Sequence, residues 1–168
     1  MTPTRPPVSL LQMVEQASAQ HGLPTGLLEG LIQVESGWNP HAVGQDERSI
    51  DRGLVQINSV AHPEVSAAEA YSPSYAIPWA AQYLSGLIRQ CGSVVGGLEA
   101  YNSGRCQGDT GYASQVLRAA QRYGLTSSDV PAEGISLPPS PSVPKSSEFL
   151  PALAILGLVV ALVVAALE

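Results

Sequence analysis

The sequence has 168 residues, of which 45% are hydrophobic and only 13% are charged, and its formal net charge is −6. This length is enough for one domain with a hydrophobic core. Residues 1–128 carry seven arginines against ten acidic residues, with no basic stripe, so we expect no nucleic-acid partner. The two cysteines and three histidines show no metal-ligand spacing, so we expect neither a metal site nor a cofactor.

The composition divides the chain into three segments. Residues 1–128 have the pattern of a folded domain, whereas residues 129–148 hold five prolines and five serines, a composition that favours an extended linker. Residues 149–167 contain no charged side chain. As a helix they would be about 28 Å long, close to the hydrocarbon thickness of a bilayer. We therefore predict a single C-terminal transmembrane helix, residues 149–168, that anchors the domain to a membrane.

Hydrophobic periodicity and capping residues predict a mainly α-helical domain. The expected helices span residues 9–21, 24–35, 78–90, 94–101 and 112–123. Gly22, Gly92 and Gly124 follow three of these segments, as glycine does where a helix ends in a left-handed residue. No alternating strand pattern of any length occurs. We expect at most a small hairpin near residues 48–58.

Glu35 is the most informative residue of the domain. It follows Leu28, Leu31 and Ile32 at helical spacing, so one helix would place the carboxyl in the middle of an apolar stripe. It is also the last residue before a Ser-Gly break, and negative charge at a helix C-terminus is unfavourable. Both effects raise the pKa of a carboxyl. A carboxyl that stays protonated near neutral pH is suited to general acid catalysis.

The two cysteines leave two alternatives open. Cys91 and Cys106 could remain two free thiols, or they could form a disulfide that closes a short loop. Such a disulfide would add roughly 3 kcal/mol of stability to a protein that works outside the reducing cytosol.

Three short blocks extend the argument from Glu35 to a family. They are residues 35–40 (ESGWNP), 53–58 (GLVQIN) and 100–104 (AYNSG). In this order and spacing they resemble the lytic transglycosylases of the soluble-lytic-transglycosylase family, which is related to goose-type lysozyme. Residues 49–59 resemble most the branch associated with pili, secretion systems and phage particles. The resemblance implies a lysozyme-like helical fold that cleaves the β-1,4 bond between N-acetylmuramic acid and N-acetylglucosamine in peptidoglycan.

The resemblance also assigns roles to single residues. Glu35 matches the catalytic glutamate, which would protonate the glycosidic oxygen and then deprotonate the 6-hydroxyl of muramic acid, giving a 1,6-anhydro product. Ser36, Gln56, Tyr101 and Asn102 match positions that bind substrate. The amide of Gln56 can donate to and accept from sugar groups. The ring of Tyr101 can pack on a sugar, and its hydroxyl is expected to donate a hydrogen bond to Glu35.

Three other functions compete with this assignment. A lysozyme would hydrolyse the same bond with a second carboxylate that activates water, and Asp51, just before the second block, is the one acid near the blocks that fits this role. A catalytically inactive, wall-binding module would keep the fold and lose the chemistry. A pore former would act through the apolar tail. We predict a transglycosylase, which needs a single carboxylate, because no acid other than Glu35 belongs to the three blocks.

The N-terminal residues contain no apolar stretch of signal-peptide length, although peptidoglycan lies outside the cytoplasmic membrane. We therefore expect a virion-associated phage enzyme that opens the host cell wall locally during genome entry. It would be held in an internal membrane or an apolar socket of the particle, next to virion structural proteins. The alternative is a wall-remodelling enzyme of a secretion or pilus system in the host inner membrane.

Overall fold

Residues 6–45, 48–107 and 110–130 are described by the computed structural model, and they fold mainly into α-helices. The helices are α1 (Val8–His21), α2 (Leu27–Glu35), α3 (Ala67–Tyr71), α4 (Pro73–Cys91), α5 (Val94–Ser103) and α6 (Thr110–Ala120). The strands are β1 (Val43–Gln45), β2 (Ile50–Arg52) and β3 (Ile57–Asn58), and two 3-10 helices are η1 (Gln121–Tyr123) and η2 (Ser127–Asp129). The prediction of a mainly α-helical domain is confirmed.

The predicted transmembrane segment, residues 149–168, and nearly all of the predicted linker lie outside the described residues. Among the helices that the structure describes, none combines the length and the apolar character needed to cross a membrane. The division of the chain at residues 128 and 148 stays a prediction.

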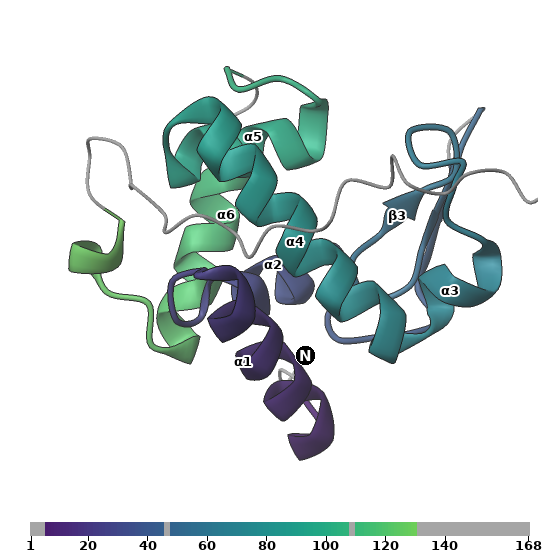
Figure 1. The fold of residues 1–168 in the computed structure, drawn as a ribbon, viewed down its shortest axis with the longest axis horizontal. Coiled ribbons are helices and arrows are strands. Elements are labelled where there is room, and N and C mark those ends of the chain that lie inside the picture. The colour runs from purple at the N-terminus through teal and green to yellow at the C-terminus, as the bar shows by residue number, and fades with distance from the viewer. Residues whose placement is uncertain (1–5, 46–47, 108–109, 131–168) are drawn as a thin grey trace, which may run out of the picture. The chain divides into compact units, whose positions relative to one another are not determined.

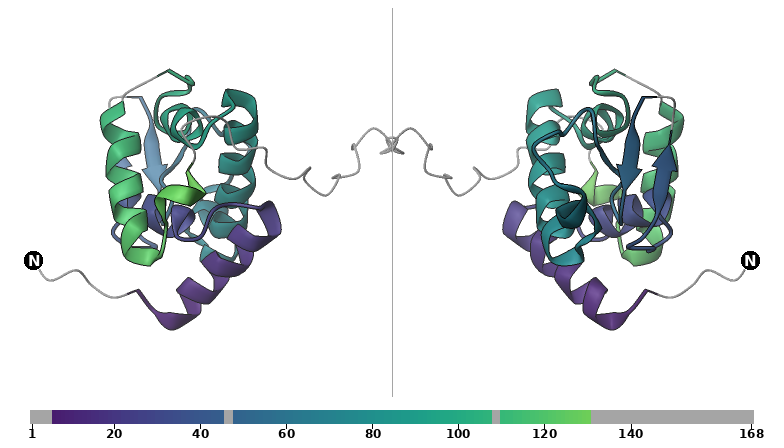
Figure 2. Two further views of the ribbon diagram at one scale, coloured as in Figure 1. Left: turned by 90° about the vertical axis from the view of Figure 1, so that its left-hand side faces the viewer. Right: turned by 90° about the vertical axis from the view of Figure 1, so that its right-hand side faces the viewer.

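Helix α2 lies in the interior of the described residues, with α1 and α6 packed against it (Figure 2). All of its residues from Leu27 to Ile32 are buried. Two glycines allow the close approach to α6. A Cβ atom on Gly30 would lie 2.7 Å from the Cβ of Ala120. A Cβ atom on Gly26 would lie 2.7 Å from the carbonyl oxygen of Ala120. The central helix therefore fits against α6 only because these two positions lack side chains.

The strands form an antiparallel sheet in the order β1-β2-β3, in which Gly44 pairs with Asp51 and Arg52 pairs with Ile57. Figure 1 shows the sheet and α3 beside one end of α4, and α5 beside the other end. The expected hairpin near residues 48–58 is confirmed as β2 and β3. Strand β1 adds a third strand that the sequence pattern did not indicate.

Helix α4 begins earlier than predicted. The expected start at Pro78 is wrong, because the helix begins at Pro73 and contains Pro78 in its interior. Pro73 occupies the first helical position, where the missing N–H has no helical partner in any case. Pro78 removes one helical hydrogen bond, to the carbonyl of Ser74, and both residues are exposed on the surface. Gly92 ends the helix in the left-handed conformation, as expected.

Helix α5 packs against α4 through Gly97, where a Cβ atom would lie 2.5 Å from Ile88. It continues to Ser103, slightly beyond the predicted end at residue 101. Cys91, the last residue of α4, forms a disulfide with Cys106, which follows α5. The open alternative for the two cysteines is thus settled as a disulfide, and it fixes the loop after α5 to the end of α4.

Candidate active site

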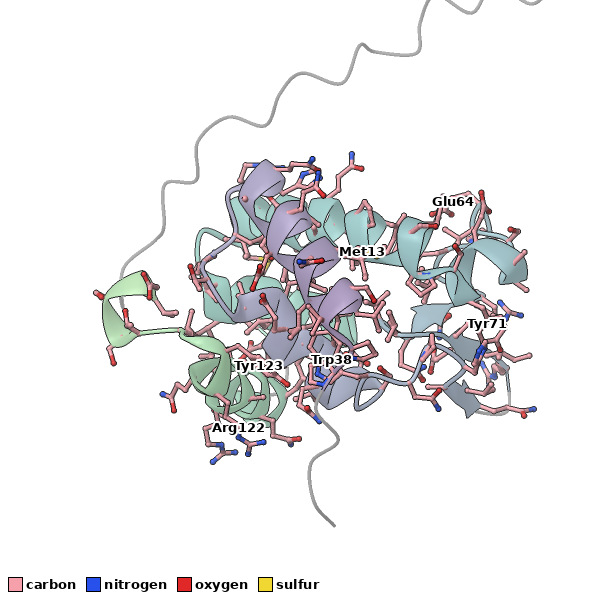
Figure 3. The ribbon with its side chains drawn as sticks, turned by 90° about the horizontal axis from the view of Figure 1, so that it is seen from below. Met13, Trp38, Glu64, Tyr71, Arg122 and Tyr123 are labelled. Carbon is pink, nitrogen blue, oxygen red and sulfur yellow. A yellow bond between two sulfur atoms is a disulfide. The ribbon has the colours of Figure 1, made fainter. Side chains whose placement is uncertain are left out.

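Glu35 is the last residue of α2 and is half-buried. The chain turns away immediately after it, because Gly37 and Trp38 both have positive φ, at 59° and 69°. Trp38 is buried, and its indole N–H donates a 3.0 Å hydrogen bond to the hydroxyl of Tyr123. The two rings lie side by side in Figure 3. A tryptophan with positive φ is strained and persists only when its surroundings hold it, so this contact fixes the end of α2.

Tyr112 of α6 donates the hydrogen bond that holds Glu35, to carboxyl oxygen Oε1. We expected this role for Tyr101, and that expectation is wrong. The Tyr101 hydroxyl donates instead to the backbone carbonyl of Val55 at 2.8 Å. Tyr112 lies four residues before the apolar Val116, and this helical spacing was the one signal in the sequence for the direction of its side chain.

Burial raises the pKa of Glu35 from 4.5 to about 7. The hydrogen bond from Tyr112 lowers the pKa, because it stabilises the carboxylate, and the nearby charge of Asp51 raises it again. Burial and the charge of Glu35 also raise the pKa values of Tyr101 and Tyr112. Both phenols therefore stay neutral near neutral pH, and Tyr112 remains a donor.

Ser36 links the first block to the second through a hydrogen bond. Its hydroxyl donates to the carbonyl of Leu54 at 2.8 Å and lies 3.3 Å from the carbonyl of Ile32. The structure therefore uses the hydroxyl hydrogen of Ser36 within the protein. That Ser36 binds substrate stays a prediction. Because its hydroxyl hydrogen is used within the protein, the Ser36 oxygen can only accept a hydrogen bond from the substrate.

The second block forms a tight turn between β2 and β3. Gly53 has a φ of 75°, and a side chain there would collide with the carbonyl oxygen of Ala70. Gln56 also has a positive φ, of 50°, which is rare for a residue with a side chain. Its Nε2 donates to the carbonyl of Gly53 at 2.8 Å and to that of Ala42 at 3.4 Å. The side-chain oxygen is thus the part of the Gln56 amide that remains for a ligand.

Asp51 of β2 lies close enough to Glu35 to raise its pKa. Its Oδ1 accepts a 2.7 Å hydrogen bond from Nδ2 of Asn58, which also donates to Ser49 at 2.9 Å. This network fixes the orientation of Asp51 beside the acid.

A groove of about 450 Å³ runs between the sheet, α4 and α5. Three of the five predicted site residues line it: Gln56, Tyr101 and Asn102. Glu35 and Ser36 do not belong to its lining. The carboxyl of Glu35 nevertheless lies next to the wall, because its charge raises the pKa of Tyr101. Glu35 is half-buried, so the acid is partly shielded from water near this wall.

Aromatic side chains of α4, which the sequence argument did not include, form another wall of the groove. The rings of Trp79 and Tyr83 stack with centroids 5.0 Å apart, and His62 contacts both edge-on at 4.8 Å. Tyr83 lies 5.5 Å from Tyr101. Trp79 and Tyr83 occur four residues apart within a predicted helix. That spacing predicted that the two side chains share one face of the helix, but it did not predict that this face lines a groove.

The groove, the shielded acid and the helical fold agree with the family that the sequence comparison gives. Residues 12–117 match the family model described as Transglycosylase SLT domain, and the match includes all three blocks. The chain belongs to this family, which confirms the resemblance. No curated protein matches the chain significantly. The family assignment gives peptidoglycan as the substrate class. The family match does not show an association with a phage, a pilus or a secretion system.

Proposed function

We propose that this protein is a peptidoglycan lytic transglycosylase that cleaves the bond between N-acetylmuramic acid and N-acetylglucosamine and leaves a 1,6-anhydro product. The observation that carries the proposal is the state of Glu35. Its carboxyl is shielded beside the groove, its pKa is raised to about 7, and Tyr112 holds one of its oxygens. A group with this pKa can give a proton and take one back near neutral pH.

In the first step the protonated carboxyl of Glu35 gives its proton to the oxygen that links the two sugars, and the bond from this oxygen to C1 of muramic acid breaks. The Tyr112 hydroxyl stabilises the carboxylate that forms. In the second step the 6-hydroxyl oxygen of the same muramic acid bonds to C1, and Glu35 accepts the hydroxyl proton. The enzyme returns to its starting state, and no water is consumed.

The residues that line the groove position the sugars. Asn102 offers an exposed amide, Gln56 offers its side-chain oxygen, and Tyr101 lines the groove near Glu35. The anchoring of Tyr101 to the carbonyl of Val55 keeps this ring in place. A rigid arrangement of this kind reduces the entropy that binding must remove.

The product identifies the reaction. Mass spectrometry of glycan strands digested by the protein should find 1,6-anhydromuramic ends. Reducing muramic ends would instead support a lysozyme-type hydrolase, the alternative favoured by the proximity of Asp51 to Glu35. In that case Asp51→Asn should abolish the activity, whereas under the proposed mechanism the anhydro product persists in this variant. Absence of either product, with binding to glycan retained, would favour the inactive wall-binding module.

The second part of the proposal concerns location. We propose that the protein is carried in a phage particle, with residues 149–167 in a membrane or an apolar socket, and opens the host wall during genome entry. The resemblance of residues 49–59 to the phage- and pilus-associated branch supports this. The Cys91–Cys106 disulfide fits an enzyme that acts outside the reducing cytosol. Detection of the protein in purified particles tests the location. Its presence only in the host inner membrane would favour a secretion or pilus system.

A further inference from the structure

A second groove, of about 480 Å³, runs along the outer face of α4. It adjoins the first groove, because the stacked rings of Trp79 and Tyr83 line both. The remaining lining residues are Gln82, Gly86, Leu87, Arg89 and Gln90. Nothing in the proposed reaction uses this groove, and its position makes it the path that any extension of the substrate past the stacked rings would take.

Gly86 forms the floor of this groove and is unlike the other glycines of the helices. A Cβ atom on Gly97 or Gly30 would collide with a neighbouring element, so packing explains those two. A Cβ on Gly86 would have only the Nη2 atom of Arg89 within 4.0 Å. Glycine in the middle of a helix lowers stability relative to alanine, and no packing contact compensates for it here. An open floor beside a groove is the remaining physical use of this position.

Arg89 carries the only charge among the described residues that line the second groove. Its Nη1 donates a 2.6 Å hydrogen bond to Ser85, whose hydroxyl donates in turn to the carbonyl of His21 at 3.0 Å. This chain holds the guanidinium over Gly86. Among residues 6–45, 48–107 and 110–130, no carboxylate lies within salt-bridge distance of Arg89. An arginine that is held in place without an acidic partner is suited to bind a carboxylate from a ligand.

We propose that the second groove binds the short peptide attached to muramic acid, with Arg89 binding a carboxylate of that peptide and Gly86 leaving room for its backbone. The inference rests on the proposed function. The glycan of a peptide-bearing strand is uncharged, because the lactyl carboxyl of muramic acid is bonded to the peptide. The carboxylates of such a strand therefore belong to its peptides, and they are the groups that match the charge of Arg89.

The test compares two substrates that differ only in charge: soluble peptide-bearing glycan strands, and the same strands with their peptide carboxylates converted to primary amides. We expect the parent protein to cleave both, with KM about tenfold lower for the charged strands, the effect of one charge-assisted hydrogen bond. The Arg89→Gln variant should cleave both substrates with the higher KM that the parent shows for the amidated strands. Equal losses on both substrates, or no loss on the charged strands, would overturn the inference and leave the proposed function intact. If the parent gives no anhydro product from either substrate, the proposed function itself fails.

Gly86→Leu provides a second test that does not depend on charge. Its side chain would fill the floor of the groove, so KM for the charged strands should rise while the melting temperature stays at or above that of the parent. Gln16→Leu on the exposed face of α1, outside both grooves, is the matched control and should leave KM unchanged. An unchanged KM in a folded Gly86→Leu variant would show that the substrate does not reach this groove.

Discussion

Tyr112 donates its phenolic hydrogen to Glu35 from a helix that lies 77 residues further along the chain. Burial raises the pKa of the carboxyl, and this hydrogen bond limits the rise. The balance leaves Glu35 with a pKa of about 7, near the pH at which both of its protonation states are populated. The pair therefore sets the chemistry of the site more directly than any contact within the three sequence blocks.

Replacing Glu35 by glutamine should remove the activity and keep the fold. Glutamine matches the shape of glutamate and can still accept the hydrogen bond of Tyr112, but it has no proton to transfer. We expect the release of anhydro ends to fall by about a thousandfold, within the range of general acid–base catalysis. Glu15→Gln, which changes an exposed acid of α1 outside both grooves, serves as the control. Wall clearance at the parent's rate by Glu35→Gln would exclude Glu35 as the acid.

Replacing Tyr112 by phenylalanine should shift the pH profile to higher pH. The hydrogen bond from Tyr112 lowers the pKa of Glu35, so its loss raises that pKa. In the parent, kcat/KM should decline as pH rises above about 7, because the acid must be protonated to begin the reaction. In Tyr112→Phe this decline should begin at higher pH, with a maximal rate about tenfold lower since the carboxylate loses a donor. Tyr101→Phe is the control for the midpoint, because its hydroxyl donates to Val55 and not to Glu35. An identical midpoint in all three proteins would contradict the assigned role of Tyr112.

The stability of the protein should fall as pH rises through neutrality. The pKa of Glu35 is raised in the folded protein, from 4.5 to about 7. The folded state therefore binds more protons than the unfolded state between these values, and its advantage is present below pH 4.5 and lost as pH rises through about 7. This shift corresponds to at most about 3 kcal/mol of unfolding free energy. Urea unfolding at several pH values measures it.

Burial raises the pKa of Glu29 as well, so that residue adds to the slope in the same direction. Comparison of the parent with Glu35→Gln isolates the part due to Glu35, because the variant keeps Glu29. Parallel curves for the two proteins between pH 4.5 and 8 would show that the Glu35 carboxyl is not perturbed.

Reduction of the Cys91–Cys106 disulfide should destabilise the domain. The two residues are 15 positions apart, and a closed loop of this size contributes roughly 3 kcal/mol by restricting the unfolded chain. Thermal melting with and without a reducing agent measures the effect. The double variant Cys91→Ser, Cys106→Ser should melt like the reduced parent and should not respond to the reductant. A parent that melts at the same temperature in both conditions would contradict the stabilising role.

The sequence predicted those parts of the fold that local chemistry determines. Gly22, Gly92 and Gly124 end helices as expected, since a left-handed residue is a local requirement. The direction of Glu35 followed from helical spacing in the same way. The start of α4 could not be obtained locally, because Pro73 and Pro78 both carry a start signal, and the stretch between them is helical and buried at Ala76 and Ile77.

The site was predictable in its residue types and not in its contacts. The partner of Glu35 depends on how α6 packs against α2, which in turn depends on the missing side chains of Gly26 and Gly30. Strand β1 was missed because its three residues, Val43–Gln45, carry no alternating pattern of their own. They pair with β2 beside the side-chain oxygen of Gln56, where Gly44 leaves room for it.

The hydrogen bond from Ser36 to the carbonyl of Leu54 also limits how this enzyme can move. It joins the residue after the acid to the turn between β2 and β3, so a hinge motion that separates these two elements would have to break it. The position of Glu35 is therefore coupled to that of this turn. A motion that opened the groove without breaking this bond would move the turn and the end of α2 together.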